Sequence, residues 1–141
     1  MPEPKTVERA KEDLRRGKRP TTAAGEFVRE EIHHVREGKH GARSAKQAIA
    51  IGLSKARRAG VPLAPPARGQ TSERTRKSAE RAYEAGQSDG ARHQPSPRRS
   101  RAVKRALERE PKRAASPRAL SRQAKSAATT RRRHAGTRAG R

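Results

Sequence analysis

Apolar residues at helical spacing in one stretch, Thr22–Val61, decide what this chain can fold into. At about 100° per residue, four large apolar side chains of its first half fall on one face of a helix: Phe27, Val28, Ile32 and Val35. Gly38 follows them, and a glycine in this place is typical of the left-handed residue that ends a helix. The pattern predicts an amphipathic helix of about three to four turns that ends at Gly38.

A second helix is predicted directly after a short basic loop that contains glycine. Ser44 with Gln47 three residues later is a capping-box pattern, which would start the helix at Ala45. Gly60 and Pro62 would end it. Its narrow apolar face consists largely of small residues: Ala45, Ala48, Ile49, Gly52, Leu53 and Ala56. Because small residues accept bulky ones from a facing helix, the simplest arrangement of the pair is an antiparallel hairpin.

Large apolar residues are scarce in the rest of the chain. The 141 residues include one Phe, one Tyr and no Trp, and 37 lysines and arginines against 14 acids give a formal charge of +23. Ordering one residue costs roughly 1–2 kcal/mol of backbone entropy, which burial of apolar surface has to offset. High net charge with low hydrophobicity is typical of disorder. We therefore expect an all-α fold of short helical hairpins with substantial disordered basic segments as linker and tail.

The amino-terminal part divides into two predicted units. Residues 1–20 contain a short helix, Thr6–Arg16, which Thr6 would cap. Its thin apolar stripe consists of Val7, Ala10 and Leu14. Residues 21–66 hold the hairpin and form the core module. A module this small is near the lower limit for independent folding, which leaves docking of the first helix, homodimerisation or ligand binding as ways to complete it.

Three further segments complete the predicted organisation. Residues 67–99 form a linker with one polar helix, within Ser72–Ala85, and an extended end rich in Pro, Ser and Arg. Residues 100–128 hold a second pair of short helices, the later of which starts at Ser116-Pro117 because proline favours the first helical position. Residues 129–141 have no apolar periodicity and are predicted to be a disordered basic tail.

The excess of positive charge indicates a polyanionic partner, most strongly nucleic acid. Free N–H groups at the start of the 45–59 helix attract phosphate, and basic residues precede that start. Ser96-Pro97-Arg98-Arg99 is similar to elements of linker-histone tails that place two cations in the minor groove, with a plain linker as the alternative. The candidate nucleic-acid-binding residues are Lys39, Arg43, Lys46, Lys55, Arg57, Arg58, Arg98, Arg99, Arg131, Arg132 and Arg133.

Chemistry other than binding has little support in the sequence. No Ser/His/Asp set, Gly-rich phosphate loop or pair of carboxylates in an apolar setting occurs, so an enzyme is not expected. The five histidines include adjacent His33 and His34, whose side chains point to different sides of a helix, so no metal site and no cofactor is predicted. No apolar run of about 18 residues occurs, so insertion into a membrane is not expected.

Two long blocks give the chain a family resemblance. They are EFVREEIHHVREGKHGARSAKQAIAIGLSKARRAGV, Glu26–Val61, and SRAVKRALEREPKRAASPRALSRQAKSAA, Ser100–Ala128. Both resemble blocks of small, basic, largely uncharacterised bacterial proteins that carry the label DNA-binding or histone-like. The resemblance implies a bacterial, non-enzymatic protein and assigns no base-reading residue.

These observations predict a nucleoid-associated or histone-like protein of the bacterial cytoplasm that binds double-stranded DNA mainly through phosphates. Binding to structured RNA or to the ribosome is an alternative that rests on the same charge. A non-enzymatic protein-interaction adaptor, with the 27–53 hairpin as its docking surface, is a second alternative. Readers of single strands are disfavoured because aromatic platforms for stacked bases are nearly absent.

Overall fold

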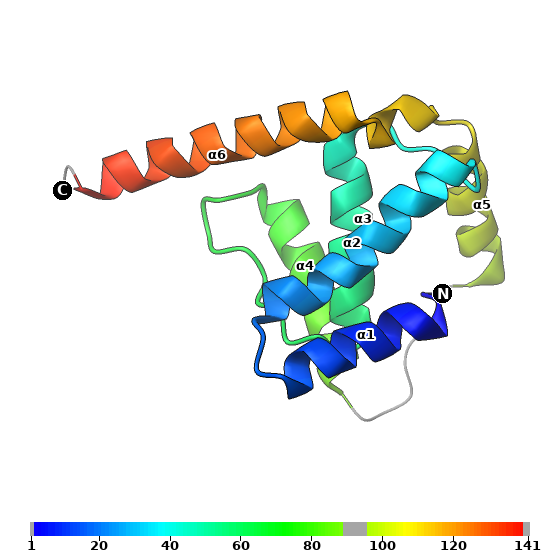
Figure 1. Cartoon of the computed structure of the whole chain (residues 1–141), viewed down its shortest axis with the longest axis horizontal. Helices are drawn as coiled ribbons and strands as arrows, with labels where there is room; N and C mark the ends of the chain where they lie inside the picture. The colour runs from blue at the N-terminus through cyan, green and yellow to red at the C-terminus, as the bar shows by residue number, and fades with distance from the viewer. Residues whose placement is uncertain (1, 89–95, 140–141) are drawn as a thin grey trace.

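The structure confirms the all-α class. The computed structural model describes residues 2–88 and 96–139, and within these ranges it contains six α-helices, one short 3-10 helix and no β-strand. In chain order (Figure 1) the elements are α1 (Pro4–Arg15), α2 (Pro20–Glu37), α3 (Ala45–Arg58), α4 (Glu73–Gln87), α5 (Pro97–Glu108), the 3-10 helix η1 (Lys112–Ala115) and α6 (Pro117–Ala139). In this described part of the chain, no helix combines the length and the apolar character that crossing a membrane requires.

α1 lies antiparallel beside α2, and both contribute to the main core (Figure 1). The buried residues of this core are Ala10, Ala23, Ala24, Phe27, Ala56 and Val61. Val7 and Leu14 pack against it, which confirms the apolar stripe predicted for the first helix. The predicted cap is wrong, because α1 begins at Pro4 and Thr6 lies buried within the helix. Proline suits the first helical turn, where its missing N–H costs nothing.

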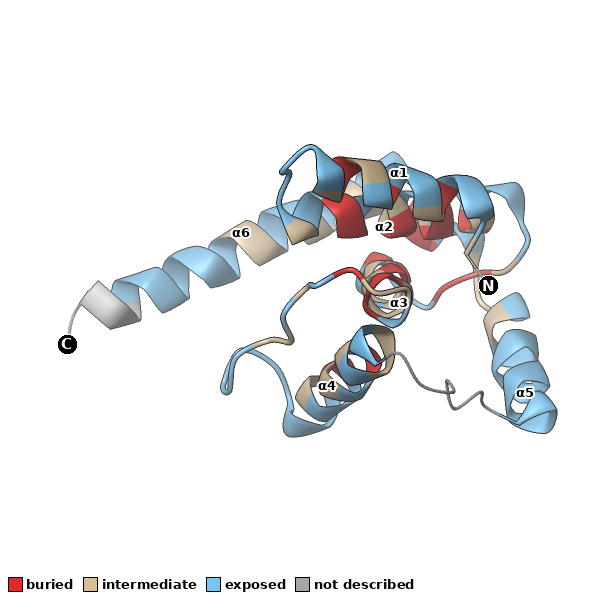
Figure 2. Cartoon of the chain, turned by 90° about the horizontal axis from the view of Figure 1, so that it is seen from below, coloured by how far each residue is buried: buried red, intermediate tan, exposed pale blue. Residues whose placement is uncertain are grey.

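α2 and α3 cross at a wide angle instead of running antiparallel as predicted. Figure 2 views α3 end-on while α2 runs across the view. The helices approach closely at Gly52, where an added Cβ would lie 2.6 Å from the Cα of Val28. Ala48 and Ala56 are fully buried on the same face, so the prediction that small residues of this helix accept α2 is confirmed. α2 is longer than predicted, with 18 residues from Pro20.

α4 is the polar helix predicted within the 67–99 linker, and it packs against α3. Ser72 caps it by accepting a hydrogen bond from the backbone N–H of Thr75, and Ala79 and Ala82 are buried. The carboxyl ends of the two helices lie together, since a Cβ added at Gly86 would lie 1.8 Å from the carbonyl oxygen of Arg57. The packed module therefore extends beyond the boundary predicted at residue 66.

The carboxyl-terminal elements dock on the same body through η1. Ala114 and Ala115 are buried in a second cluster with Val35, Ala42 and Ala48. The backbone N–H of Gly41 donates to the carbonyl oxygen of Leu107 at 2.8 Å, and that of Ala42 donates to Pro111 at 3.1 Å. Arg36 Nε also donates to the carbonyl oxygen of Ala115 at 2.8 Å. The segment predicted as a second helical pair is thus tied to the loop between α2 and α3.

Two predictions for the carboxyl-terminal half need correction. Ser96-Pro97 was expected in an extended stretch, but Ser96 caps α5 by accepting from the backbone N–H of Arg99 at 3.3 Å. Residues 129–139, predicted as disordered tail, continue α6. Alanines and arginines are good helix formers, so the nucleus at Ser116-Pro117 extends without an apolar stripe. Part of the predicted extended end, residues 89–95, and the last two residues lie outside the described residues.

Candidate nucleic-acid interface

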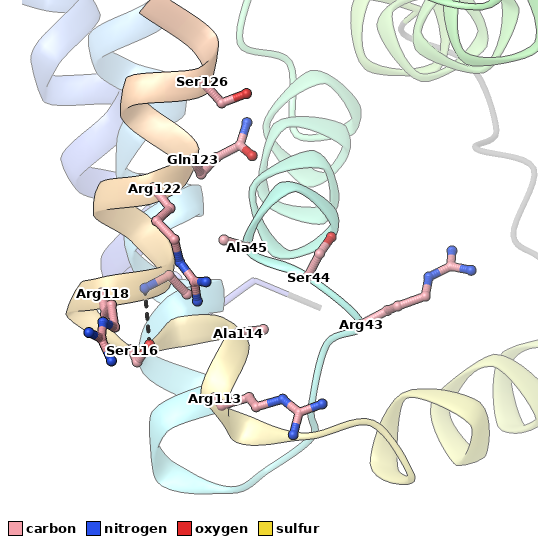
Figure 3. A pocket seen from close by; sticks show the side chains of 11 residues that line it. Arg43, Ser44, Ala45, Arg113, Ala114, Ser116, Arg118, Arg122, Gln123 and Ser126 are labelled. Carbon is pink, nitrogen blue, oxygen red and sulfur yellow. Dashed lines mark hydrogen bonds between the residues drawn. The ribbon is translucent and has the colours of Figure 1, made fainter.

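An open groove of about 600 Å³ lies between the first turn of α3 and the η1–α6 segment (Figure 3). Four arginines and no acid line it, together with small and polar residues. The four arginines are Arg43, Arg113, Arg118 and Arg122. All four are exposed, and within the described residues none of them forms an ion pair with a carboxylate. We call this feature the arginine groove.

Two helices begin at the arginine groove. Ser44 caps α3 by accepting from the backbone N–H of Gln47 at 3.1 Å. Ser116 caps α6 in the same way, by accepting from the backbone N–H of Ala119 at 3.1 Å (dashed line in Figure 3). Helix starts carry a partial positive charge and N–H groups without intrahelical partners. Both helix starts therefore add to the positive potential that the arginines create.

Side chains reach the groove from both walls. Gln123 and Ser126 point from α6 toward α3, whereas Arg43 extends away from α6 along the outer rim (Figure 3). Arg118 and Arg122 are four residues apart, so they share one side of α6. The guanidinium group presents up to five donors in a planar fork that matches the oxygens of a phosphate. The groove is thus chemically suited to anions that carry several oxygen acceptors.

α6 continues the basic surface beyond the groove. At about 100° per residue, four basic side chains fall within a sector of about 80° on this helix: Arg118, Arg122, Lys125 and Arg132. We call this set the α6 stripe. Arg131 lies on the opposite side of the helix. With 23 residues, α6 is about 35 Å long at 1.5 Å per residue, and it projects away from the helical body (Figure 1).

The structure brings only some of the predicted binding residues to this surface. Arg43 lines the groove, Lys46 is exposed in the adjoining first turn of α3, and residues 131–133 belong to α6. Lys39 lies elsewhere on the loop, with its Nζ 3.5 Å from Glu37 Oε2. Arg58 is exposed at the far end of α3. Arg98 and Arg99 are exposed in the first turn of α5, at the end of that helix farther from η1 (Figure 1).

Lys55 and Arg57, also predicted to bind nucleic acid, interact with the protein itself. Lys55 Nζ pairs with the carboxylate of Glu31, which is fully buried and also lies 3.1 Å from His40 Nε2. Arg57 is 8% exposed, and its guanidinium donates at 3.2 Å to the carbonyl oxygens of Leu63 and Ala64. Burial lowers the pKa of the Arg57 guanidinium from its ordinary value. Lys55 therefore neutralises a buried carboxylate beside α3, and Arg57 stabilises the segment that follows this helix.

Replacement of Lys55 by methionine tests this structural role. Lys55→Met is expected to lower the free energy of unfolding by about 3 kcal/mol, the low end of the range for a broken buried ion pair, since Lys55 is partly exposed. Glu31 would then keep a buried charge with only His40 beside it. Lys46→Met removes an exposed lysine of the same helix and should change the free energy by less than about 0.5 kcal/mol. Urea denaturation followed by circular dichroism measures both, and equal effects would contradict the structural role.

The sequence analysis did not predict three of the four groove arginines as binding residues. Arg113, Arg118 and Arg122 belong to η1 and α6. The helix start at Ser116-Pro117 and the four-residue spacing of Arg118 and Arg122 were visible signals. No local pattern, however, indicates that the start of α6 lies beside the start of α3, because that depends on contacts between distant residues.

Comparison of the chain with protein-family models, with curated proteins and with solved structures finds no match. The geometry and charge of the arginine groove and the α6 stripe are therefore the basis of the functional argument.

Proposed function

We propose that this chain is a non-enzymatic protein that binds double-stranded DNA through the phosphates of both strands, with little sequence preference. The observation that carries the proposal is the arginine groove, lined by four arginines and no acid, which continues into the α6 stripe. The formal charge of +23 supplies the long-range attraction that phosphate-dominated binding needs.

The side chains at the groove favour contacts to phosphate over contacts to bases. Base edges are read by side chains inserted into a groove of the duplex, amides at adenine and guanidinium groups at guanine. The guanidinium groups here line a groove of the protein itself, where the phosphates on the outside of a duplex can reach them. Gln123 is the single amide side chain among the residues that line the arginine groove. Phosphate contacts position a protein on the duplex without carrying sequence information. Weak sequence preference is the expected consequence.

The length of α6 and the lack of aromatic platforms favour a duplex over a single strand. A helix of about 35 Å is as long as about one turn of the duplex. The single Phe of the chain, Phe27, is fully buried, and the single Tyr, Tyr83, is partly buried. Single-strand binders stack bases on exposed aromatic rings. The resemblance of residues 26–61 and 100–128 to histone-like bacterial proteins supports a role in the bacterial nucleoid.

Paired charge-removing variants test the assignment of the groove. Arg118→Gln combined with Arg122→Gln should make the slope of log affinity against log salt concentration less steep by about 1.8, because each lost phosphate contact removes about 0.9. The matched control, Arg74→Gln combined with Lys77→Gln, removes two exposed cations from α4 and should leave the slope nearly unchanged. Fluorescence anisotropy with a labelled duplex measures the slopes. Equal changes of slope in the two double variants would contradict the assignment of the groove as the binding surface.

Competition between nucleic acids tests the class of partner. Nuclease-treated protein should prefer duplex DNA to matched structured RNA and to single strands at one fixed salt concentration. A preference for structured RNA would replace the DNA proposal with the RNA alternative. Retention of a protein partner after nuclease treatment, without affinity for either nucleic acid, would favour the adaptor alternative.

A further inference from the structure

A separate polar cluster lies where the chain segment before α1 meets α2. Glu30 and His34 are four residues apart on α2, so they share a face, and Glu3 immediately precedes α1. One potential ligand atom from each of these three residues lies within 4.8 Å of the other two. All three residues line a small cavity of about 160 Å³, together with Arg9 and Arg29, and the cavity gives a small ion access to them.

The negative charge of the buried Glu30 carboxylate is only partly compensated by its neighbours in this cluster. Glu30 is 7% exposed, and its Oε1 accepts a hydrogen bond from the backbone N–H of Glu3 at 2.6 Å. Its Oε2 is buried and has no hydrogen-bond partner among the residues that the structure describes. Within the described residues, no lysine, arginine or histidine forms an ion pair with Glu30. A buried carboxylate is costly unless it is paired or binds a metal ion, so this oxygen indicates a missing cation.

His34 and Glu3 provide donors of the right kind beside Glu30. His34 Nε2 lies 3.3 Å from Glu3 Oε1, which is close to the separation of about 3.3 Å between two ligands of a tetrahedral zinc ion with bonds of 2.0–2.1 Å. The hydrogen bond from His34 lowers the pKa of the Glu3 carboxyl. Carboxylates and neutral imidazoles are the forms of these side chains that bind metal ions. Lys39 Nζ also forms an ion pair with Glu3 Oε1, at 3.8 Å.

The geometry points to a binding site for a divalent transition-metal ion of the Zn²⁺ type, with Glu3, Glu30 and His34 as its protein ligands. Three protein ligands leave one position of a tetrahedral ion for water. An imidazole among the donors favours Zn²⁺, Co²⁺ and Ni²⁺ over Mg²⁺ and Ca²⁺, which prefer oxygen alone. Because the ligands come from α2 and from the residue before α1, a bound ion ties the start of the chain to the core. This site is independent of the arginine groove.

Metal titration of the tag-free full chain, stripped with a chelator, tests the site. Calorimetry with Zn²⁺ should show one saturable equivalent, and Zn²⁺ should raise the melting temperature while Mg²⁺ at the same concentration leaves it unchanged. His34→Gln and Glu30→Gln should each weaken Zn²⁺ binding by more than about 100-fold. Loss of a residue that only supports a metal ligand through a hydrogen bond costs roughly 10–100-fold in affinity. His134→Gln removes an exposed histidine of α6, outside this cavity, and should keep the wild-type affinity.

The Glu30→Gln variant shows whether Glu30 is a metal ligand or a residue that only stabilises the fold. Without metal, its melting temperature should equal or exceed that of the wild type, because a neutral amide replaces an uncompensated buried charge. With Zn²⁺, the rise in melting temperature should be lost. Several outcomes would overturn the site: no saturable binding, an equal response to Mg²⁺, or wild-type affinity in His34→Gln. Wild-type affinity in Glu30→Gln would also overturn it and assign the ion to the neighbouring group of Glu31, His34 and His40.

Discussion

The affinity of the chain for duplex DNA is expected to fall by about 10³–10⁵-fold when the salt concentration rises from about 50 to about 200 mM. The range corresponds to about six to ten phosphate contacts, each of which releases counterions from the duplex. The arginine groove, Lys46 and the remaining residues of the α6 stripe supply cations in about this number. Within the part of the chain that the structure describes, none of the four groove arginines pairs with a carboxylate, so little of their positive potential is cancelled locally.

Anisotropy titrations with unrelated duplexes of about 30 base pairs, roughly three helical turns, measure this dependence. Similar slopes and affinities for all duplexes are expected, since phosphates carry no sequence information. A flat salt dependence would contradict phosphate-dominated binding. A strong preference for one duplex would show that bases are read directly.

Phe27→Ala is expected to lower the free energy of unfolding by about 3–5 kcal/mol. Phe27 is fully buried where α1, α2 and α3 meet, among alanines that have no bulk with which to fill the space it would leave. Figure 2 shows that buried residues concentrate on these three helices. Domains of this size are stable by only about 5–15 kcal/mol. The variant should therefore unfold at markedly lower urea concentration and lower temperature.

Val103→Ala is the matched control for this experiment. Val103 is a large hydrophobic residue of α5 and is 55% exposed, so its truncation should change the free energy of unfolding by less than about 0.5 kcal/mol. Circular dichroism during urea denaturation measures both variants. A loss below about 1 kcal/mol in Phe27→Ala would show that the packing around α2 is not the main source of stability.

Helix ends could be predicted from the sequence because the interactions that set them act within a few residues. Gly38 has the left-handed conformation expected of it, with φ of 80°, and Ser44 caps α3 as predicted. Val61 folds back on the last turn of α3, with its N–H donating to the carbonyl oxygen of Ala56 at 3.1 Å. The start of α6 follows from Ser116-Pro117 in the same way. These features depend on local hydrogen bonds and on backbone preferences, which neighbouring residues determine.

The roles of charged residues could not be predicted from local patterns. Lys55 and Arg57 have the same sequence character as Arg58, which is exposed. Their burial follows from the positions of Glu31, 24 residues before Lys55, and of the 63–64 carbonyl oxygens. In the sequence, Arg118 and Arg122 look like ordinary surface charges. They line a groove only because the structure places the start of α6 beside α3. A charge acquires its role from the groups that surround it in three dimensions.

The sequence alone therefore determined the all-α class, the positions of most helix ends and the small-residue face of α3. The tertiary structure decided the wide crossing of α2 and α3, the packing of α4 and the docking of η1. The contacts responsible join residues far apart in the chain, such as the hydrogen bond from Arg36 to the carbonyl oxygen of Ala115, 79 residues away. Helical periodicity shows which face of a helix is buried but not which distant segment covers it. The arginine groove exists because several such contacts bring the start of α6 to the start of α3.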